Sequence, residues 1–320
     1  MNLYRLRLRP RSAWVTPWQA DTLSGLLCWT LARSEGQDVL QREILQPAAR
    51  GDPPFVLSDA FPAGLLPVPV SVRLHDYPPE QRKNIKRARW LPVDDFRRFQ
   101  TGTAPPPDNL LPDGTVYQSL LNLRNKLDRA SGTTGGAGEG GLFSVLERHF
   151  KPEWIKQGHP AELDLYVRVA SSFEGRFVGL LHQLAVCGFG ADSSVGKGQF
   201  DLVSPTLVPE PDLDNALGAN GIVALSTFQP APDDPTDGQW EAFTKYGKLG
   251  PDFGVDNVFK RPLVMFRPGA TFRTHPPRER VGRCIPMSEL LAPEACDHLN
   301  ARDTAVAHLA FGLAVPAQLS

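Results

Sequence analysis

The stretch Glu162–Phe200 carries the pattern that decides the fold and reads ELDLYVRVASSFEGRFVGLLHQLAVCGFGADSSVGKGQF. Residues Glu162–Val169 alternate between polar and apolar side chains, which is the period of a half-buried strand. In Phe173–Cys187 the apolar side chains instead recur at helical spacing. A glycine-rich loop occupies 188–198, and a strand is expected from Phe200 onward. The stretch therefore predicts the order strand, helix, glycine-rich loop, strand.

The glycine-rich loop has the chemistry of a phosphate-binding site. Glycine lets the backbone adopt positive φ, successive N–H groups then form a concave donor surface, and Lys197 adds a point charge. The loop is not a P-loop, because five residues separate Gly190 from Gly196 and Gly198 stands where a magnesium-binding Ser or Thr is required. The order helix, loop, strand is also the reverse of a P-loop. We therefore predict phosphate binding without ATP binding.

Charge is distributed unevenly along a chain whose formal net charge is −1. Between Arg82 and Arg98 there are seven Lys and Arg residues, whereas Glu210–Asp256 holds nine acids against two lysines. This division suits one face for an anionic ligand and another, in the acidic region, for a protein partner. An ordinary solvated surface explains the same charges equally well.

The four cysteines show no metal-binding spacing, and Cys28 and Cys187 lie in apolar helical contexts typical of buried thiols. This usage favours a reducing compartment. The first residues predict a strand rather than a signal peptide, and no apolar run reaches the length of a membrane span. We therefore expect a cytoplasmic protein without a membrane segment.

The order of elements predicts an α+β fold made of two ferredoxin-like (RRM-type) units with antiparallel sheets. The first unit, residues 1–208, has an alternating strand at Leu3–Pro10 and a helix starting near Asp21. It also carries a long insertion (about 36–160) and the glycine-rich loop. The second, degenerate unit spans residues 209–320. Further strands are expected at 55–58, 68–74, 221–226, 262–267 and 305–313, further helices at 239–246 and 287–291, and a mobile loop at 122–141.

Several motifs together resemble one family. Leu3-Tyr-Arg-Leu, Thr16-Pro-Trp-Gln-Ala-Asp-Thr-Leu-Ser-Gly-Leu-Leu-Cys-Trp and Phe55-Val-Leu-Ser-Asp-Ala-Phe-Pro are similar to the opening of a CRISPR RAMP protein. The resemblance is to the type III-A (Csm) effector-complex subunit that binds the 5′ handle of the crRNA. The insertion (Asn122–Thr134), the glycine-rich loop, Lys260-Arg-Pro-Leu-Val-Met and His308-Leu-Ala-Phe-Gly-Leu-Ala-Val-Pro follow in the family's order.

The resemblance implies a non-catalytic subunit that caps the crRNA 5′ handle in antiviral defence. It would also link the large palm-domain subunit to the filament of backbone RAMP subunits. Single-stranded RNA is held by phosphate contacts and by contacts to splayed bases. Because the first strand offers arginines where RNA-binding sheets display aromatic residues, we expect the loops to bind. The expected RNA-binding residues are Gly188, Gly190, Ser193, Ser194, Gly196, Lys197, Gly198, Asp21, Ser24, Asn122, Arg124, Asn125, Lys126 and Arg129.

An enzyme is the main alternative. Some RAMP relatives are metal-independent endoribonucleases that process repeat RNA with a histidine as general acid or base. His149, with Lys151 close by, is the candidate for such a role here. No histidine, tyrosine and lysine grouping surrounds the glycine-rich loop, and acids and histidines show no ligand spacing. We therefore expect no catalytic residue, no metal and no cofactor.

Overall fold

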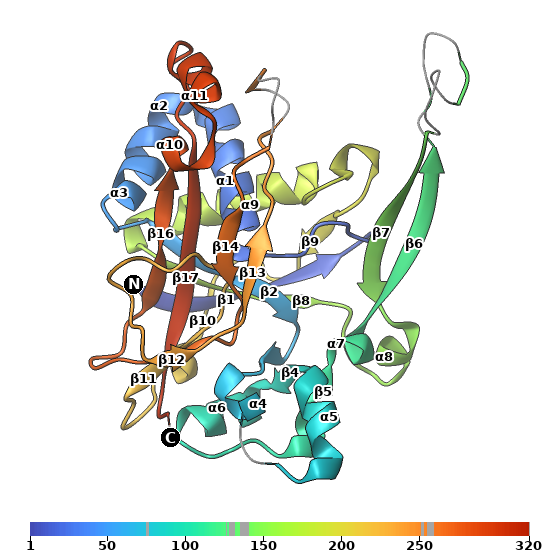
Figure 1. Ribbon diagram of the computed structural model, residues 1–320, viewed down its shortest axis with the longest axis vertical. Helices are drawn as coiled ribbons and strands as arrows, with labels where there is room; N and C mark the ends of the chain where they lie inside the picture. The colour runs from blue at the N-terminus through green and yellow to red at the C-terminus, as the bar shows by residue number, and fades with distance from the viewer. Residues whose placement is uncertain are drawn as a thin grey trace.

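The computed structural model describes residues 1–74, 77–125, 127, 132–134, 141–250, 253–254 and 259–319, which form an α+β structure of helices and antiparallel sheets (Figure 1). The described part falls into a body with two sheets, a lower lobe, and a hairpin that projects from one side. None of the described helices is both long and apolar enough to cross a membrane.

The first sheet is built around β1 (Asn2–Pro10) and β8 (Leu163–Val169), which pair antiparallel from Asn2↔Val169 to Leu8↔Leu163. β2 (Phe55–Pro62) pairs with the other edge of β8. β9 (Phe200–Leu202) and β10 (Val208–Pro209) share the free edge of β1. The spatial order β9–β1–β8–β2 brings together strands that the sequence separates by up to two hundred residues.

Two helices predicted from apolar spacing complete this sheet's connections. α1 (Ala20–Glu35) follows β1 and buries Leu23, Leu27 and Leu31. α9 (Glu174–Cys187) follows β8 and packs against α1, leading directly into the glycine-rich loop. Because each helix buries a stripe at positions three and four apart, the spacing in the sequence located both helices correctly. Cys28 is buried as expected, but Cys187 is exposed, because it lies at the last turn of α9.

The arginines of β1 are neutralised by acids within the fold. Arg7 forms an ion pair of 2.9 Å with Asp164, Arg5 one of 2.9 Å with Glu210, and Arg9 one of 2.6 Å with Glu162. Further acids and arginines extend the network, among them Arg97 on α6 (Val93–Gln100), which also contacts Glu210. The β1 guanidinium groups therefore keep a charged sheet face internally paired.

The second sheet has the order β12–β15–β11–β17–β16. Its strands are β11 (Gly221–Ala224), β12 (Gly238–Gln239), β15 (Thr271–Arg273), β16 (Arg280–Pro286) and β17 (Ala307–Ala317), and α10 (Met287–Leu290) and α11 (Pro293–Asn300) follow β16. The helix expected at 239–246 was wrong: β13 (Ala242–Lys245) pairs there with β14 (Leu263–Phe266). Pairing with a distant strand overrode the local pattern.

The two sheets share one hydrophobic core, in which Leu225, Leu313 and Val315 pack with residues of β1, β2 and β8. A bulge in β2 at Ser58 and Asp59 connects them. The buried Asp59 carboxylate accepts hydrogen bonds from the backbone N–H of Ala20 and from the N–H and hydroxyl of Thr227. The boundary at 208 stays a prediction, since the described core joins residues on both of its sides.

The segment between β2 and β8 forms the lower lobe and the projecting hairpin of Figure 1. The lobe contains β3 (Leu65–Pro67), α4 (Val70–Leu74), α5 (Pro79–Arg87), β4 (Ala88–Pro92), α6, β5 (Leu111–Pro112) and α7 (Asp113–Val116). The strand expected at 68–74 was wrong, because α4 begins just after Pro69, a residue whose fixed φ suits a helix start.

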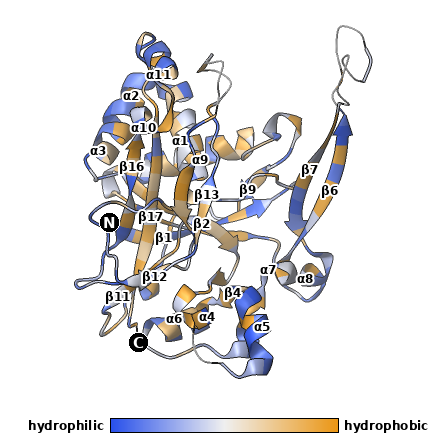
Figure 2. Cartoon of the chain, viewed as in Figure 1, coloured by the Kyte–Doolittle hydropathy of each residue, from blue (hydrophilic) through white to orange (hydrophobic). Residues whose placement is uncertain are grey.

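The hairpin consists of β6 (Tyr117–Asn125) and β7 (Leu142–Phe150), paired from Tyr117↔Phe150 to Asn125↔Leu142. α8 (Pro152–Lys156) follows it. Residues 122–125 were expected in a loop and are instead the end of a strand. Polar and apolar side chains are mixed along the hairpin, as the colours of Figure 2 show, and many of them are exposed.

Candidate functional site

The glycine-rich loop lies beside the β6–β7 hairpin, and hydrogen bonds join it to the segment that leads into α1. The N–H of Gly198 donates to the carbonyl of Ala13 (3.0 Å), and the N–H of Ala191 donates to the Thr16 hydroxyl (2.9 Å). The ring of Phe189 stacks on Trp18 at 4.1 Å between centroids. These contacts fix the loop's position, so its remaining groups face a defined environment.

At two positions of the loop, neighbouring atoms lie so close to the backbone that only glycine fits. At Gly198, where φ is +66°, a Cβ would overlap the carbonyl oxygen of Phe189. At Gly190, where φ is +77°, a Cβ would lie 2.5 Å from the Cβ of Thr16. Gly196 also has positive φ (+88°), but a Cβ there would meet no atom within 4 Å. The loop's glycines therefore serve both its tight conformation and its contact with the neighbouring backbone.

The charged centre of the site is Glu147 on β7, which sequence reasoning missed. Its carboxylate accepts hydrogen bonds from the Lys197 amine (2.5 Å), from the Arg124 guanidinium (2.8 Å) and from Asn122. Arg124 donates in addition to Asp192 of the loop at 2.8 Å. The hydrogen bond from Lys197, followed by those from Asn122 and Arg124, lowers the pKa of Glu147 to about 2. The structure thus brings Lys197, Arg124 and Asn122 together.

This cluster consists of cations that the fold already partly neutralises. Lys197 and Arg124 are each about one-quarter exposed, so an anion can still reach them, in competition with Glu147 and Asp192. Nothing in the sequence pairs Glu147 with Lys197, which lies fifty residues away, because the pairing depends on how the hairpin packs against the loop. Ser194 in the loop is exposed and Ser193 is half-buried, and both lie in a short 3-10 turn.

The remaining predicted residues are placed differently. Asn125 is exposed at the end of β6, while Lys126 and Arg129 lie outside the described residues. Asp21 and Ser24 are buried in α1, so their side chains are not accessible at its surface. The backbone N–H of Ala20, at the start of that helix, donates to the Asp59 carboxylate and is therefore already paired within the fold.

Asp21 instead belongs to a buried charged group that joins α1 to the second sheet. Its carboxylate lies 2.7 Å from the Lys245 amine and 2.9 Å from Nε2 of His308. Burial by itself would raise the pKa of Asp21, but the contact with His308 and the charge of Lys245 hold it well below its usual range. Burial in turn lowers the pKa of His308. These side chains join α1 to β17 of the second sheet and to β13.

His149, the alternative catalytic residue, is half-buried on β7. Its Nδ1 lies 3.1 Å from the carbonyl oxygen of Phe150, and its Nε2 lies 3.2 Å from the amide nitrogen of Gln118. Within the described ranges, no group of three or more His, Cys, Asp or Glu side chains is placed to hold a metal ion.

The fold has counterparts among solved structures. A chain in the crystal structure of a Csm1–Csm4 cassette in complex with pppApA matches with a TM-score of 0.60 and 17% identity, over 99% of this chain and 98% of that chain. A chain in the Csm3–Csm4 subcomplex of the type III-A CRISPR-Cas interference complex matches with a TM-score of 0.60 and 12% identity, over 99% and 100%. Csm4 is the subunit named in both assemblies. The chain has a Csm4-like fold.

The likeness extends over both sheets, the lower lobe and the hairpin, since the chain is covered almost end to end. No family profile and no curated protein matches the sequence. At identities of 17% and 12%, the match shows a common fold and does not extend to individual site residues. The residues of the glycine-rich loop and Glu147 are therefore interpreted from their own chemistry.

Proposed function

We propose that this chain is the RNA-binding subunit of a type III-A CRISPR effector complex, where it caps the 5′ handle of the crRNA. In this role it contacts the large palm-domain subunit on one side and the first backbone RAMP subunit on the other, in the cytoplasm. The observation that carries the proposal is the end-to-end match of its fold with chains from both a Csm1–Csm4 and a Csm3–Csm4 assembly.

The topology supports the same proposal. We propose that the first sheet, with the order β9–β1–β8–β2, α1 after β1 and α9 after β8, is a ferredoxin-like unit of the βαββαβ kind. We propose that the second sheet is a degenerate unit of the same kind, which lacks a helix over 239–246. Because β1 pairs its arginines with acids, this sheet offers no aromatic platform for bases, and the loops are left to bind RNA.

In this proposal the glycine-rich loop and the hairpin side chains that face it form the handle site. Lys197, Arg124, Asn122 and the loop N–H groups contact phosphates, and Glu147 positions the two cations. The chain performs no catalytic step. The groups beside His149 are an amide and a carbonyl, which do not supply a partner for general acid–base cleavage.

Co-purification tests the assembly. We expect the tagged chain, expressed with its large and backbone subunits and a crRNA, to purify with both proteins and with RNA retaining its 5′ handle. A crRNA whose handle is replaced by an unrelated sequence should be lost from the complex. Recovery of both proteins with either RNA alike would contradict handle capping while leaving the assembly role in place.

Variants of the purified chain test the site and the alternative activity. Lys197→Ala with Arg124→Ala should weaken binding of a repeat-derived RNA and flatten the log–log salt dependence by about 0.7 per lost phosphate contact. Arg50→Ala, which removes an exposed cation outside the hairpin and the glycine-rich loop, is the matched control. The RNA should stay intact with or without EDTA, and cleavage abolished by His149→Ala would establish the endoribonuclease instead.

A further inference from the structure

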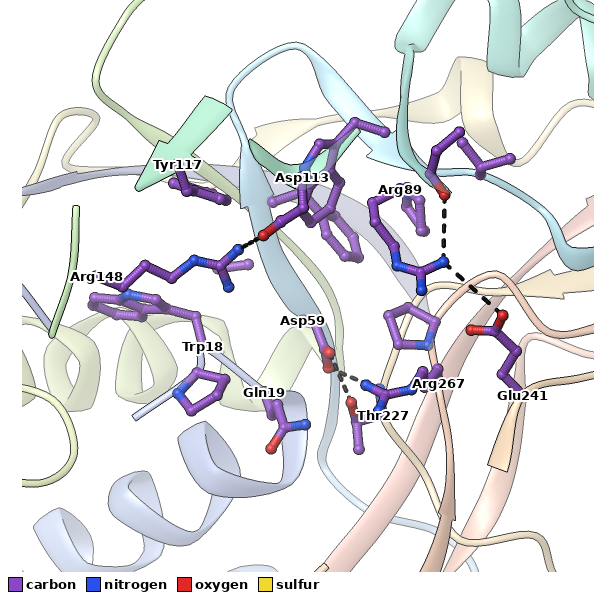
Figure 3. A pocket seen from close by; sticks show the side chains of 18 of the residues that line it. Trp18, Gln19, Asp59, Arg89, Asp113, Tyr117, Arg148, Thr227, Glu241 and Arg267 are labelled. Atoms are coloured by element: carbon purple, nitrogen blue, oxygen red, sulfur yellow. Dashed lines mark hydrogen bonds and ion pairs between the residues drawn. The ribbon is translucent and has the colours of Figure 1, made fainter. Parts of the chain in front are cut away.

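A cavity of about 300 Å³ lies between the body, the lower lobe and the base of the hairpin, next to the glycine-rich loop (Figure 3). Its walls come from the segment before α1, from β2, β4, α7 and β7, and from the loops that carry Thr227, Glu241 and Arg267. This volume is at the lower end of the range for sites that hold small organic molecules. None of the residues assigned above to phosphate contacts lines it.

Aromatic side chains form much of the lining. Trp14, Trp18, Phe61, Trp90 and Tyr117 all face the cavity. Trp18 carries the stack on Phe189, so this wall is continuous with the glycine-rich loop. Trp14 and Trp90 meet Tyr117 edge to face, at 5.6 and 6.1 Å between ring centroids. Such walls suit a planar ring system.

The cavity's polar groups are mostly donors. Four arginines, Arg73, Arg89, Arg148 and Arg267, line it, and Figure 3 shows three of them reaching the space from different elements. Its acids are engaged by the protein: Asp113 by Arg148, Glu241 by Arg73, and Asp59 by Ala20 and Thr227.

Four N–H groups on the lining have no protein acceptor. They are Nε1 of Trp18 and Trp90 and Nε of Arg73 and Arg148, and each of these atoms is buried. Buried donors are nearly always hydrogen-bonded in proteins. The cavity therefore matches a ligand that has an aromatic ring and several acceptor oxygens or nitrogens.

Three exposed cations lie on α5, close to this cavity. Lys83, Lys86 and Arg87 are exposed and form no ion pair with any described residue, and Figure 2 shows α5 as hydrophilic. This differs from Lys197 and Arg124, which Glu147 already holds. α5 continues directly into β4, whose Arg89 lines the cavity, and Lys86 lines an adjoining groove that shares Arg73 and Glu241 with it.

We propose that this cavity is a nucleotide-binding site, which takes one unstacked base among its aromatic walls and directs the adjoining phosphates along Arg89 and α5. The proposal rests on the function proposed above only for the source of that nucleotide, which is the RNA strand. A free nucleotide presents the same ring and phosphate chemistry, and the experiment distinguishes the two.

The test uses the full chain and a short single-stranded repeat RNA, together with copies that lack one base at each successive position. One abasic position should weaken binding by about 5- to 150-fold, the range for loss of one stacked base. Trp90→Leu and Arg89→Glu should abolish the difference between that RNA and the intact one. Replacing Lys83, Lys86 and Arg87 by Gln should flatten the salt slope by about 2, at about 0.7 for each contact.

The control for α5 is the same replacement at Arg50, Lys156 and Arg261, which are exposed and lie outside the lobe. Thermal unfolding shows whether each cavity variant is folded. Adding Lys197→Ala to a folded cavity variant should still weaken its RNA binding. If Lys197→Ala weakens RNA binding while the cavity and α5 variants do not, the cavity site is wrong and the handle site stands.

AMP provides the second arm. AMP should quench the tryptophan fluorescence saturably, and Arg89→Glu should abolish this quenching. If the chain shows this response but does not bind RNA, the cavity site is supported and RNA binding is contradicted. If neither AMP nor any abasic RNA responds to the cavity variants, water alone satisfies these donors and the proposal fails.

Discussion

Replacing Glu147 by Gln should make the chain bind single-stranded RNA with a steeper dependence on salt. In the structure, Glu147 lies 2.5 Å from the Lys197 amine and 2.8 Å from the Arg124 guanidinium, so an RNA phosphate competes with this carboxylate for both cations. The substitution keeps the side chain's size and one acceptor oxygen but removes the charge. Lys197 is then released, while Arg124 remains paired with Asp192.

The magnitude follows from counterion release. One additional cation contacting a phosphate steepens the log–log slope by about 0.7 for a single strand. Between 50 and 200 mM salt, this amounts to about a 2.6-fold larger loss of affinity in the variant than in the wild type. At the low-salt end the variant should also bind more tightly.

Fluorescence anisotropy with a labelled repeat RNA, repeated over a salt series, measures both quantities. Glu294→Gln on α11, which removes an equal charge far from the hairpin, is the control for net charge. An unchanged slope together with weaker binding would refute the reasoning, because it would mean that Glu147 itself supports the RNA contact and that Lys197 reaches no phosphate.

Three further results are expected. Burial raises the pKa of Asp59 to about 6 in the folded chain. The folded state is therefore favoured by this group below the pKa of an unfolded Asp, about 3.9, and that stabilisation is lost as pH rises through 6. In urea unfolding, Asp59→Asn should remove about 3 kcal/mol of the change in unfolding free energy between pH 4 and 6, and the same pH dependence in variant and wild type would contradict this. Gly198→Ala should lower Tm by at least about 2 °C more than Gly196→Ala, because only the former meets backbone; equal shifts would show that strain alone matters. Asp21→Ala should lower the free energy of unfolding in the same assay by about 3–5 kcal/mol, because it leaves the partly buried Lys245 without its carboxylate partner. Asp38→Ala, at an exposed position, should change it hardly at all, and similar losses in the two variants would contradict this account.

The sequence by itself determined the elements whose side chains repeat with a regular period. β1, α1, β8 and α9 were located by alternation or by helical spacing, although β8, expected to be half-buried, is buried on both faces. The glycines of the loop were found for the same kind of reason, since the positive φ they adopt suits glycine and is rare in other residues. Periodicity misplaced a helix at 239–246 and a strand at 68–74, where partners distant in the sequence and a proline decide the conformation.

Only the tertiary structure decided what the charged residues do. Arg5, Arg7 and Lys197 look available in the sequence, yet acids that are fifty to two hundred residues away hold each of them. Asp21 looks like a free helix start and is instead the centre of a buried ion pair. An ion pair depends on distance in space, which no local pattern encodes, and so the sequence supplied the cations while the fold determined which of them stay without partners.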